Sequence, residues 1–236
     1  MSNSVYTYKY PHPAVATDSV VFGFDGKKLH VLLIERGLDP YKGHWALPGG
    51  FMNMNETVEE CANRELEEET NIKNIYLEQF HVFSAVNRDP RERTLSVAFL
   101  ALVRKSDYKV IAGDDAAKAE WFDIEDLPAL AFDHTQIIAM ARERLQQILK
   151  FKPIAFNLLD KNFIMSELQN LYELIYQTKF DRRNFQKKMI ATGLLKDEGI
   201  CKTPMQCKPP HLFSFNESLY IKTLNSKTNK KYPFNF

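Results

Sequence analysis

The chain has 236 residues, of which 44% are hydrophobic and 26% charged, a composition typical of a globular protein that can bury a core. It contains no run of about 18 apolar residues, so no membrane-spanning helix is predicted, and residues 1–11 lack the charged and apolar regions of a secretory signal. Three cysteines, with no framework of pairs, fit a reducing compartment. We therefore expect a cytoplasmic protein with no membrane partner.

The net charge of +1 hides an asymmetry along the chain. Residues 152–236 hold 14 Lys and Arg against 7 Asp and Glu, whereas residues 1–151 hold 17 against 23. An acidic front and a basic back indicate two modules with different partners, which we place at residues 1–150 and 151–236. The basic module is the one expected to contact nucleic acid. A zinc site is not predicted, because the spacing of Cys201, Cys207 and His211 matches no common finger and a fourth ligand is missing.

The front module alternates strand-like and helical segments. Apolar and β-branched runs predict strands at residues 17–24, 29–35, 75–86, 94–103 and 119–122. The Asp25-Gly26 turn between the first two strands indicates a β-hairpin. Helices are predicted at residues 57–70 and 134–149, and Pro153 closes the second. This order predicts an α/β domain in which a mixed sheet is sandwiched by helices.

The first of these helices carries its own start and stop signals. Thr57 followed by Glu60 is the capping-box pattern, in which each side chain accepts a hydrogen bond from the other residue's backbone N–H. Asn71 follows the last helical residue and tolerates the left-handed conformation that ends a helix. One face of the helix is apolar at helical spacing, with Val58, Cys61, Ala62 and Leu66.

Three carboxylates crowd another face of this helix. Glu65, Glu68 and Glu69 are three and four residues apart, so they repel one another unless a cation lies between them. Their oxygen atoms suit a hard divalent ion, Mg²⁺ or Mn²⁺, which can also bind diphosphate oxygens while water cleaves a phosphoanhydride. Glu56 and Arg64 stand where they could brace the glutamates. The alternative interpretation of the glutamates alone is a solvated acidic helix face.

The complete pattern resembles the Nudix box. A Gly49-Gly50 pair is followed after five intervening residues by Glu56, and then by Arg64-Glu-Leu-Glu-Glu-Glu-Thr-Asn-Ile72. The resemblance implies a Nudix fold for residues 14–149. It also implies the following catalytic residues, of which the last three are metal ligands: Glu56, Arg64, Glu65, Glu68 and Glu69. One position departs, because the family has Gly where Asn71 stands, and Asn accepts a positive φ.

Basic side chains are predicted on loops that border the ligand cleft of such a sheet. Cations there suit phosphate groups, and arginine can bind a phosphate in a bidentate fashion. With the glycine pair, the predicted ligand-binding residues are Arg36, Lys42, Gly49, Gly50, Arg88, Arg91 and Arg93. Taken singly, each cation has solvated surface as its alternative. Trp45 could stack on a base, with a position in the core as its alternative.

Two further segments look like those of ADP-ribose-type Nudix proteins. They are Asn87-Arg-Asp-Pro-Arg-Glu-Arg93 and Gly113-Asp-Asp-Ala-Ala117. This resemblance points to ADP-ribose or a related nucleotide sugar as the ligand. In the family the general base often comes from a loop outside the box, and the candidates in this chain are Asp114, Asp115 and Glu120.

The back module has a different pattern. A helix with an apolar stripe is predicted to open at Ser166, and a second helix is capped by Asp181 and ended by Gly193. Residues 194–220 predict two strands around a Pro-rich tip, and residues 222–236 a polar, frayed tail. Helix, short turn, helix and hairpin in this order predict a small winged helix-turn-helix domain.

The second helix of this module has the layout of a recognition helix. Phe185 and Met189 share its underside, while Arg183, Asn184 and Lys187 project away from it. Cations can bind phosphates there, and Arg or Asn can read base edges. The predicted DNA-binding residues, the last two on the wing, are Arg182, Arg183, Asn184, Lys187, Lys188, Lys202 and Lys208. A basic, solvated helix of an accessory domain is the alternative.

This module resembles the winged helix of Nudix-related transcriptional regulators. The residues that carry the resemblance are Tyr172-Glu-Leu-Ile-Tyr176 and Phe180-Asp-Arg-Arg-Asn-Phe-Gln-Lys-Lys188. The group includes the ADP-ribose-sensing repressors of NAD metabolism and the arabinose-responsive regulators. The resemblance implies a homodimer that binds a double-stranded DNA operator. The wing departs from the usual Gly-Arg-Pro of the family, since it carries Lys208-Pro209-Pro210.

Three hypotheses follow. The first is a transcriptional regulator whose Nudix domain senses ADP-ribose or a related nucleotide sugar. The second is an active Nudix hydrolase that cleaves ADP-ribose or another nucleoside diphosphate compound with Mg or Mn, which the intact set of box carboxylates favours. The third is a pentose sensor, whose cleft would need no metal.

Overall fold

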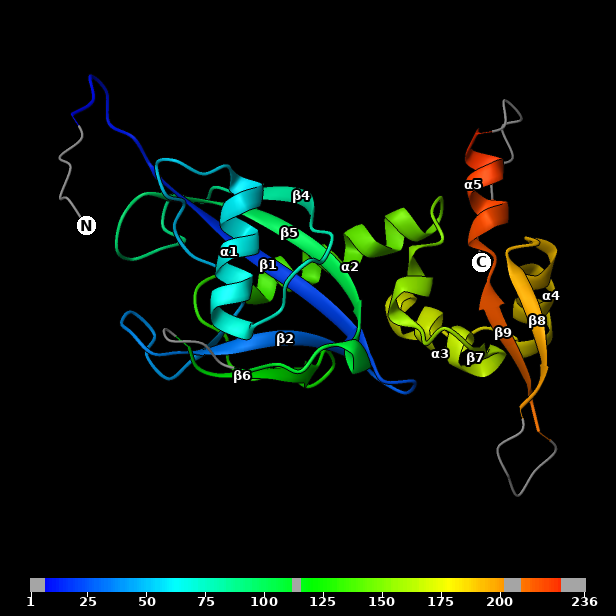
Figure 1. Ribbon diagram of the computed structural model, residues 1–236. Helices are drawn as coiled ribbons and strands as arrows, with labels where there is room; N and C mark the ends of the chain where they lie inside the picture. Colours follow the sequence, from blue (N-terminus) through cyan, green and yellow to red (C-terminus); the bar gives the residue numbers. More distant parts are fainter. Residues whose placement is uncertain (1–6, 112–115, 202–208, 226–236) are drawn as a thin grey trace.

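The computed structural model of the protein describes residues 7–111, 116–201 and 209–225. These residues form a larger front part and a smaller back part (Figure 1). None of the helices in the described ranges is long and apolar enough to cross a membrane.

Among the described residues, a six-stranded sheet forms the centre of the front part. Its strands are β1 (Ala14–Phe24), β2 (Leu29–Arg36), β3 (Trp45–Ala46), β4 (Glu78–Phe83), β5 (Thr94–Arg104) and β6 (Ala116–Asp123). The order is β3-β2-β1-β5-β4, and β6 pairs with β2. β1 pairs antiparallel with β2 across the Asp25-Gly26 turn and parallel with β5, which confirms the mixed sheet.

Helices cover both faces of this sheet (Figure 1). α1 (Val58–Thr70) lies over one face and α2 (His134–Leu149) over the other, while the short helix η1 (Lys105–Asp107) follows β5. Successive side chains of a strand point to opposite faces, and β1 shows this alternation. Val21 packs in the cluster that contains Leu66 of α1. Its neighbours Val20 and Phe22 pack in the cluster that contains Ile137 of α2.

The ends of α1 and α2 lie where the sequence predicts them. Thr57 accepts a hydrogen bond from the N–H of Glu60 at 3.2 Å, and Glu60 accepts one from the N–H of Thr57 at 2.8 Å. Asn71 adopts the left-handed conformation, with a φ of 58°. These local signals decide where the carboxylates of α1 stand relative to the loop that precedes the helix.

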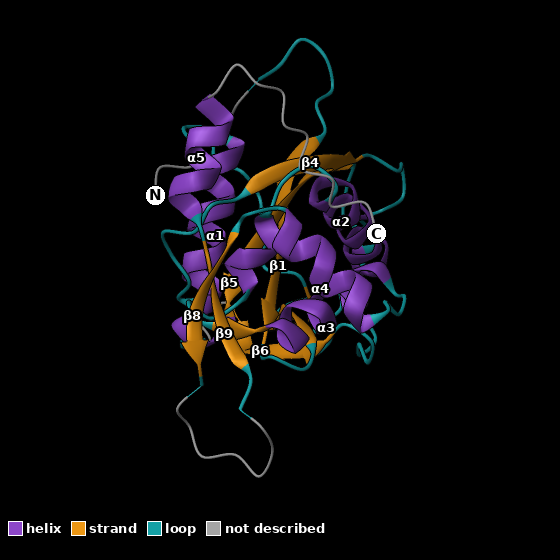
Figure 2. Ribbon diagram, turned by 90° about the vertical axis from the view of Figure 1, so that its right-hand side faces the viewer, coloured by secondary structure: helices purple, strands orange, loops and turns teal. Residues whose placement is uncertain are grey.

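The back part is a winged helix domain, as predicted. Its elements are η2 (Ile154–Leu158), β7 (Phe163–Ile164), α3 (Met165–Tyr176), α4 (Arg182–Ala191), β8 (Leu195–Ile200), β9 (His211–Phe215) and α5 (Glu217–Asn225). The strands pair in the order β7-β9-β8, and Figure 2 shows α3 and α4 to one side of the β8–β9 hairpin. Asp181 caps α4 by accepting the N–H of Asn184 at 2.9 Å, and Gly193 follows the helix with a φ of 72°.

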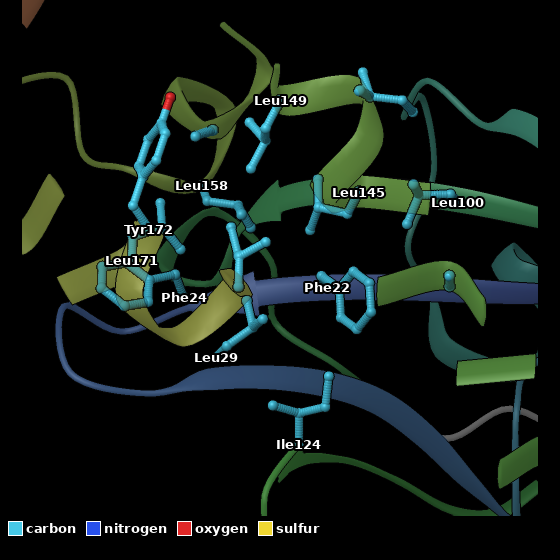
Figure 3. Packing of buried hydrophobic residues seen from close by; sticks show 14 of the residues in the cluster. Phe22, Phe24, Leu29, Leu100, Ile124, Leu145, Leu149, Leu158, Leu171 and Tyr172 are labelled. Atoms are coloured by element: carbon cyan, nitrogen blue, oxygen red, sulfur yellow. The ribbon is translucent and has the colours of Figure 1, made fainter. Parts of the chain in front are cut away.

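One hydrophobic core runs through both parts (Figure 3). Phe24 and Leu29 of the front sheet belong to the same cluster of buried residues as Tyr172 of α3. The side-chain amide of Asn170 on α3 also donates to the carbonyl of Lys27 at 2.8 Å. The winged helix is therefore packed against the sheet of the front part.

The bounds predicted for β4 and for α3 need correction. The strand predicted at residues 75–86 is shorter, because Asn74 turns the chain with a φ of 58° and the pairing with β5 ends at Phe83. The helix predicted to open at Ser166 begins one residue earlier, at Met165. Its N-terminus is satisfied by Glu167, which accepts the N–H of Ile164 at 2.9 Å.

The end of the described chain differs more from the prediction. Residues 217–225 form the helix α5, where the sequence predicts the end of a strand and the start of a frayed tail. Asn216 opens this helix by accepting the N–H of Leu219 at 3.2 Å. The ring of Tyr220 packs 5.8 Å from that of Phe215, so the helix is held by the wing that precedes it.

Candidate functional site

The loop before α1 passes close to both the sheet and the helix. A Cβ at Gly49 would overlap with the carbonyl oxygen of Thr17 on β1, so glycine is required there. A Cβ at Gly50 would overlap with the carboxylate of Glu65, whose side chain would have to move aside. This close approach places the backbone of the loop against the carboxylates of the helix.

Arg64 joins three of the box carboxylates. Its guanidinium donates to Glu56 at 2.6 and 2.9 Å, to Glu65 at 2.7 Å and to Glu68 at 3.0 Å. The hydrogen bonds from Arg64 hold the pKa of Glu56 down to about 2, and the same contacts raise the pKa of Arg64. The predicted brace and two of the predicted metal ligands thus form one hydrogen-bonded unit.

Glu69 stands apart from that unit and points inward. Its residue is 8% exposed, and its carboxylate accepts the N–H of Gly49 at 2.8 Å. Burial raises the pKa of Glu69 to about 8, because the charged form loses its water and Glu65 lies nearby. Glu69 is therefore a carboxyl group that needs a cation, or a proton, to be buried at low cost.

We expect Glu69→Gln to stabilise the metal-free protein increasingly as the pH rises. The unfolded pKa is near 4.5 and the folded pKa is about 8, so the folded state holds the extra proton between these values. Across this pH range, the free energy of unfolding of the wild type should therefore fall by about 1.4 kcal/mol per pH unit relative to that of the variant. Urea unfolding at pH 5, 6.5 and 8 in the presence of a chelator measures the difference.

Glu68→Gln provides the control, because this neighbouring side chain is 59% exposed. We expect it to change the free energy of unfolding by no more than about 0.5 kcal/mol at each pH. If the free energy of unfolding depended on pH in the same way for the wild type and Glu69→Gln, Glu69 would not be a buried carboxyl group that holds a proton.

A cleft opens beside the box. Of the residues predicted to bind ligand, those that line it are Arg36, Gly49, Gly50, Arg88 and Arg91. Lys42 and Arg93 do not line it, and both are exposed. Arg93 instead donates to the carbonyl of Ala85 at 3.1 Å. The lining residues that the sequence did not single out are Asp18, Leu47, Phe51, Asp89, Phe132 and His134.

A buried network of charges forms the floor of this cleft. The side chain of Arg88 is 4% exposed and donates to Asp133 at 2.7 and 3.0 Å and to Asp18 at 3.1 Å. Ser96 also donates to Asp18. The N–H of Leu47 donates to Nδ1 of His134 at 2.8 Å, so the ring proton lies on Nε2, 3.3 Å from Asp18.

This network buries part of the loop at residues 87–93. Asp89 is 7% exposed and Arg88 is committed to two carboxylates, although both lie in the loop. The partners of Arg88 are 70 and 45 residues away in the sequence, which is why the local pattern did not predict them. Arg88 contributes to the cleft mainly by fixing its floor.

The remaining single-residue predictions fall in different places. Trp45 packs edge-on against Phe122 at 4.5 Å and adjoins the main core, which supports its core interpretation. Glu120 is exposed on β6. Asp114 and Asp115 lie outside the described residues.

The back part presents a basic face on α4. Phe185 and Met189 are 1% exposed, as predicted for the underside of the helix. The ring of Phe185 packs 5.6 Å from that of Tyr172 on α3. On the outer side, the predicted DNA-binding residues that are exposed are Arg182, Arg183, Asn184, Lys187 and Lys188. Lys202 and Lys208 lie outside the described residues.

Within the ranges that the structure describes, no three or more His, Cys, Asp and Glu side chains are arranged as a ready-made metal site. At the box, Arg64 takes oxygens of both Glu65 and Glu68. Of the two cysteines, Cys201 and Cys207, whose spacing matches no zinc finger, Cys207 lies outside the described residues.

Comparison with known proteins identifies both parts of the chain. The NUDIX domain family matches residues 12–141, and the NrtR DNA-binding winged helix domain matches residues 155–215. The ADPR responsive transcriptional repressor NtrR of Acinetobacter baylyi is 32% identical over 210 residues, which cover 87% of this chain and 83% of that protein.

Of two further similarities, the first concerns the front part alone and the second most of the chain. The ADP-ribose pyrophosphatase of Methanocaldococcus jannaschii is 46% identical over 129 residues, covering 55% of this chain and 73% of that protein. The crystal structure of Shewanella oneidensis NrtR complexed with a 27mer DNA superposes with a TM-score of 0.69 at 28% identity, covering 85% of this chain and 93% of that chain.

Proposed function

We propose that this chain, which belongs to the Nudix family and is a DNA-binding transcriptional regulator of the NrtR type, senses ADP-ribose in the cleft beside its Nudix box. It acts as a homodimer, whose two winged helices match the two half-sites of an operator. The ligand changes operator affinity because it binds one arrangement of the two domains better than another.

The observation that carries this proposal is the construction of α4. Five cationic or amide side chains are exposed on its outer side, while its underside is buried against the aromatic core of α3. An accessory helix that served only packing would not need so dense a basic face. The exposed face supplies phosphate contacts through its cations, and Arg183 or Asn184 supplies contacts to base edges.

Helix α2 supports a route by which the cleft affects the winged helix. At its start, Asp133 and His134 belong to the network under the cleft. Farther along, Arg142 donates to the carbonyls of Leu174 and Ile175 at the end of α3. A ligand that shifts the cleft floor would therefore move the helix on which the end of α3 rests.

The donors of the box fit a divalent cation. Glu65, Glu68 and Glu69 offer only oxygen atoms from one helix, and Glu69 is buried with its pKa raised to about 8, so a cation there would offset the cost of its charge. When bound, such an ion neutralises charge on a diphosphate. Arg64 would keep Glu56 ionised and orient Glu65 and Glu68, whose oxygens it now holds.

Hydrolysis of ADP-ribose or another nucleoside diphosphate is the second candidate function. The observation that favours it is the complete set of box carboxylates, together with the similarity of the front part to an ADP-ribose pyrophosphatase. The two functions are compatible, since a slow hydrolase could remove its own effector. A pentose effector has less support, because a pentose has no phosphate to engage Arg36 and Arg91 at the cleft.

Operator binding tests the proposal. Fluorescence anisotropy with DNA fragments from upstream of the protein's own gene should detect a specific complex, and chromatography of the same mixture should report any cleavage of added ADP-ribose. We expect ADP-ribose, and not free pentoses, to change the complex. A folded protein that binds none of these fragments while it cleaves ADP-ribose would overturn regulation in favour of the enzyme.

A further inference from the structure

The loop before α1 connects the two helices that cover opposite faces of the sheet (Figure 1). We call its residues 47–50 the glycine loop. The N–H of Gly49 donates to the carboxylate of Glu69 on α1 at 2.8 Å. Two residues earlier, the N–H of Leu47 donates to Nδ1 of His134 on α2, also at 2.8 Å. A displacement of the loop at one helix can therefore reach the other helix through two peptide units.

The glycine loop is short and stiff. Two of its carbonyls accept hydrogen bonds from β1, that of Pro48 from Ser19 at 2.8 Å and that of Gly50 from Thr17 at 2.9 Å. The proline ring fixes φ at its own position, and the close approach of Gly49 to the carbonyl of Thr17 leaves no room for the loop to bend inward. A segment without slack passes a change at one end to the other end instead of absorbing it.

His134 is fixed between the glycine loop and the sheet. It is 4% exposed, and both of its ring nitrogens are engaged, since Nδ1 accepts from Leu47 and Nε2 lies 3.3 Å from Asp18 on β1. The N–H of Ala131 also donates to the carbonyl of Trp45 at 2.8 Å, so the backbone keeps these two segments together whatever side chain stands at position 134. Because His134 is the first residue of α2, a shift of its ring acts on the start of that helix.

Helix α2 carries the connection to the winged helix. Arg142 lies about two turns after His134 and donates to the carbonyls of Leu174 and Ile175. On the next turn, Gln146 donates to the same carbonyl of Ile175 at 2.8 Å. These are among the last carbonyls of α3, which a helix leaves without a partner of its own. A movement of the start of α2 therefore reaches the end of α3, the helix against which α4 packs.

We infer that His134 is a positioning residue that couples the box to the winged helix through its hydrogen bond with Leu47. Glu69 would hold the N–H of Gly49 differently when a cation matches its charge, and the glycine loop would pass this change to α2. The cleft would then act on the operator from the side of the box. This inference rests on the proposed sensing function and names the bond through which the box takes part in it.

The floor of the cleft offers a different connection through Asp18, and two substitutions of His134 separate the two. Glutamine places an amide nitrogen near the position of Nε2, so His134→Gln keeps a donor for Asp18 and loses the acceptor for Leu47. Asparagine places an amide oxygen near the position of Nδ1, so His134→Asn keeps the acceptor and loses the contact with Asp18. The variants therefore differ in which of the two bonds survives.

The first readout is the factor by which ADP-ribose and Mg²⁺ change operator affinity, measured by fluorescence anisotropy on the full-length proteins. We expect a factor of at least about fivefold for the wild type and for His134→Asn, and of less than about twofold for His134→Gln. A residue with only a structural role would destabilise both variants and leave this factor the same in all three proteins.

Hydrogen exchange without operator gives a second readout that needs neither the effector nor a variant. Mn²⁺ suits the box carboxylates, so it should slow the exchange of amides in α1 of the wild type. We expect the exchange of residues 134–142 at the start of α2 to slow as well, and by more than that of β5. In His134→Gln, Mn²⁺ should still slow exchange in α1 but not at the start of α2.

His30→Gln is the matched control. His30 is also a buried histidine with an aspartate partner, since it is 8% exposed and hydrogen-bonded to Asp25 at 2.8 Å. It lies at the end of β2 opposite to the end that pairs with β3 and the glycine loop. The control should therefore keep the wild-type coupling factor and the wild-type response of α2 to Mn²⁺.

The outcomes separate this inference from the proposed function. If His134→Asn loses the coupling and His134→Gln keeps it, the network at Asp18 makes the connection, and the inference is wrong while the proposed function stands. If Mn²⁺ slows exchange in α1 of the wild type but not at the start of α2, the inference is overturned as well. If ADP-ribose leaves operator affinity unchanged but Mn²⁺ slows exchange at the start of α2 in the wild type and not in His134→Gln, the connection stands and the proposed effector is wrong.

Discussion

Replacing Arg183 and Lys187 together by alanine should lower operator affinity roughly 100-fold without unfolding the protein. Both residues are exposed on the outer side of α4, and alanine favours a helix, so the fold should keep its stability. The slope of log affinity against log salt should also become less steep by about 2, because two phosphate contacts are lost. Fluorescence anisotropy at several salt concentrations measures both quantities.

The matched control removes two other charges from the same half of the chain. Lys152 and Lys161 are exposed before β7 and do not belong to α4, and their double alanine variant should bind the operator with nearly the wild-type affinity and slope. If the α4 variant bound as tightly as the wild type with an unchanged salt slope, this helix would not be the DNA-contacting element.

Replacing Arg88 by methionine should destabilise the protein by about 3–5 kcal/mol, since it leaves buried carboxylates without their cation. Arg88 is 4% exposed in its side chain and bridges Asp18 and Asp133. Burial acts to raise the pKa of Asp18, but His134 and Arg88 hold it down to about 2. Ionised Asp18 therefore contributes to the free energy of unfolding of the wild type above pH 3.8, and this contribution is lost as the pH falls toward 2.

Urea unfolding at neutral pH and near pH 4 measures this prediction. The difference in the free energy of unfolding between the wild type and Arg88→Met should become smaller near pH 4, because Asp18 protonates more readily once Arg88 is gone. Arg93→Met is the control, as this arginine lies in the same loop but is exposed, and its effect should stay within about 0.5 kcal/mol. Equal effects of the two substitutions would contradict the structural role of Arg88.

Elements with local signals could be predicted from the sequence. The limits of α1 follow from Thr57, Glu60 and Asn71, whose caps involve neighbours a few residues away. The same holds for α4, which Asp181 opens and Gly193 follows. Helical spacing places Glu65, Glu68 and Glu69 on one face of α1 and the basic side chains on the outer side of α4, and the resemblances assign these two faces their roles.

The cleft could be predicted only in part, because long-range contacts build it. Arg88 looked like an exposed loop cation, and its burial depends on Asp18 of β1 and Asp133 before α2. Phe132 carries no recognisable signal in the sequence, because its place in the cleft depends on contacts with Arg36 at the end of β2 and with Arg91 in the loop at residues 87–93. Helix α5 could not be predicted from its local sequence either, because it depends on the contact between Tyr220 and Phe215 of the wing.

Ligand sensing and hydrolysis would both depend on the charged side chains of the box. Glu69 needs a cation or a proton, and Arg64 shares Glu65 and Glu68 with any metal that binds. A metal and a diphosphate that bind here would change charges directly above the network that anchors the start of α2. Ligand binding and slow cleavage would therefore act on the same connection to the winged helix.

Reciprocal measurements of ligand and operator binding test whether ADP-ribose binding is coupled to DNA binding. Operator affinity is measured with and without ADP-ribose and Mg²⁺, and ADP-ribose affinity with and without operator, while product formation is followed in the same samples. We expect ADP-ribose to change operator affinity at least about fivefold, and operator to change ADP-ribose affinity by the same factor. Unchanged operator affinity at an ADP-ribose concentration that saturates the cleft would contradict it.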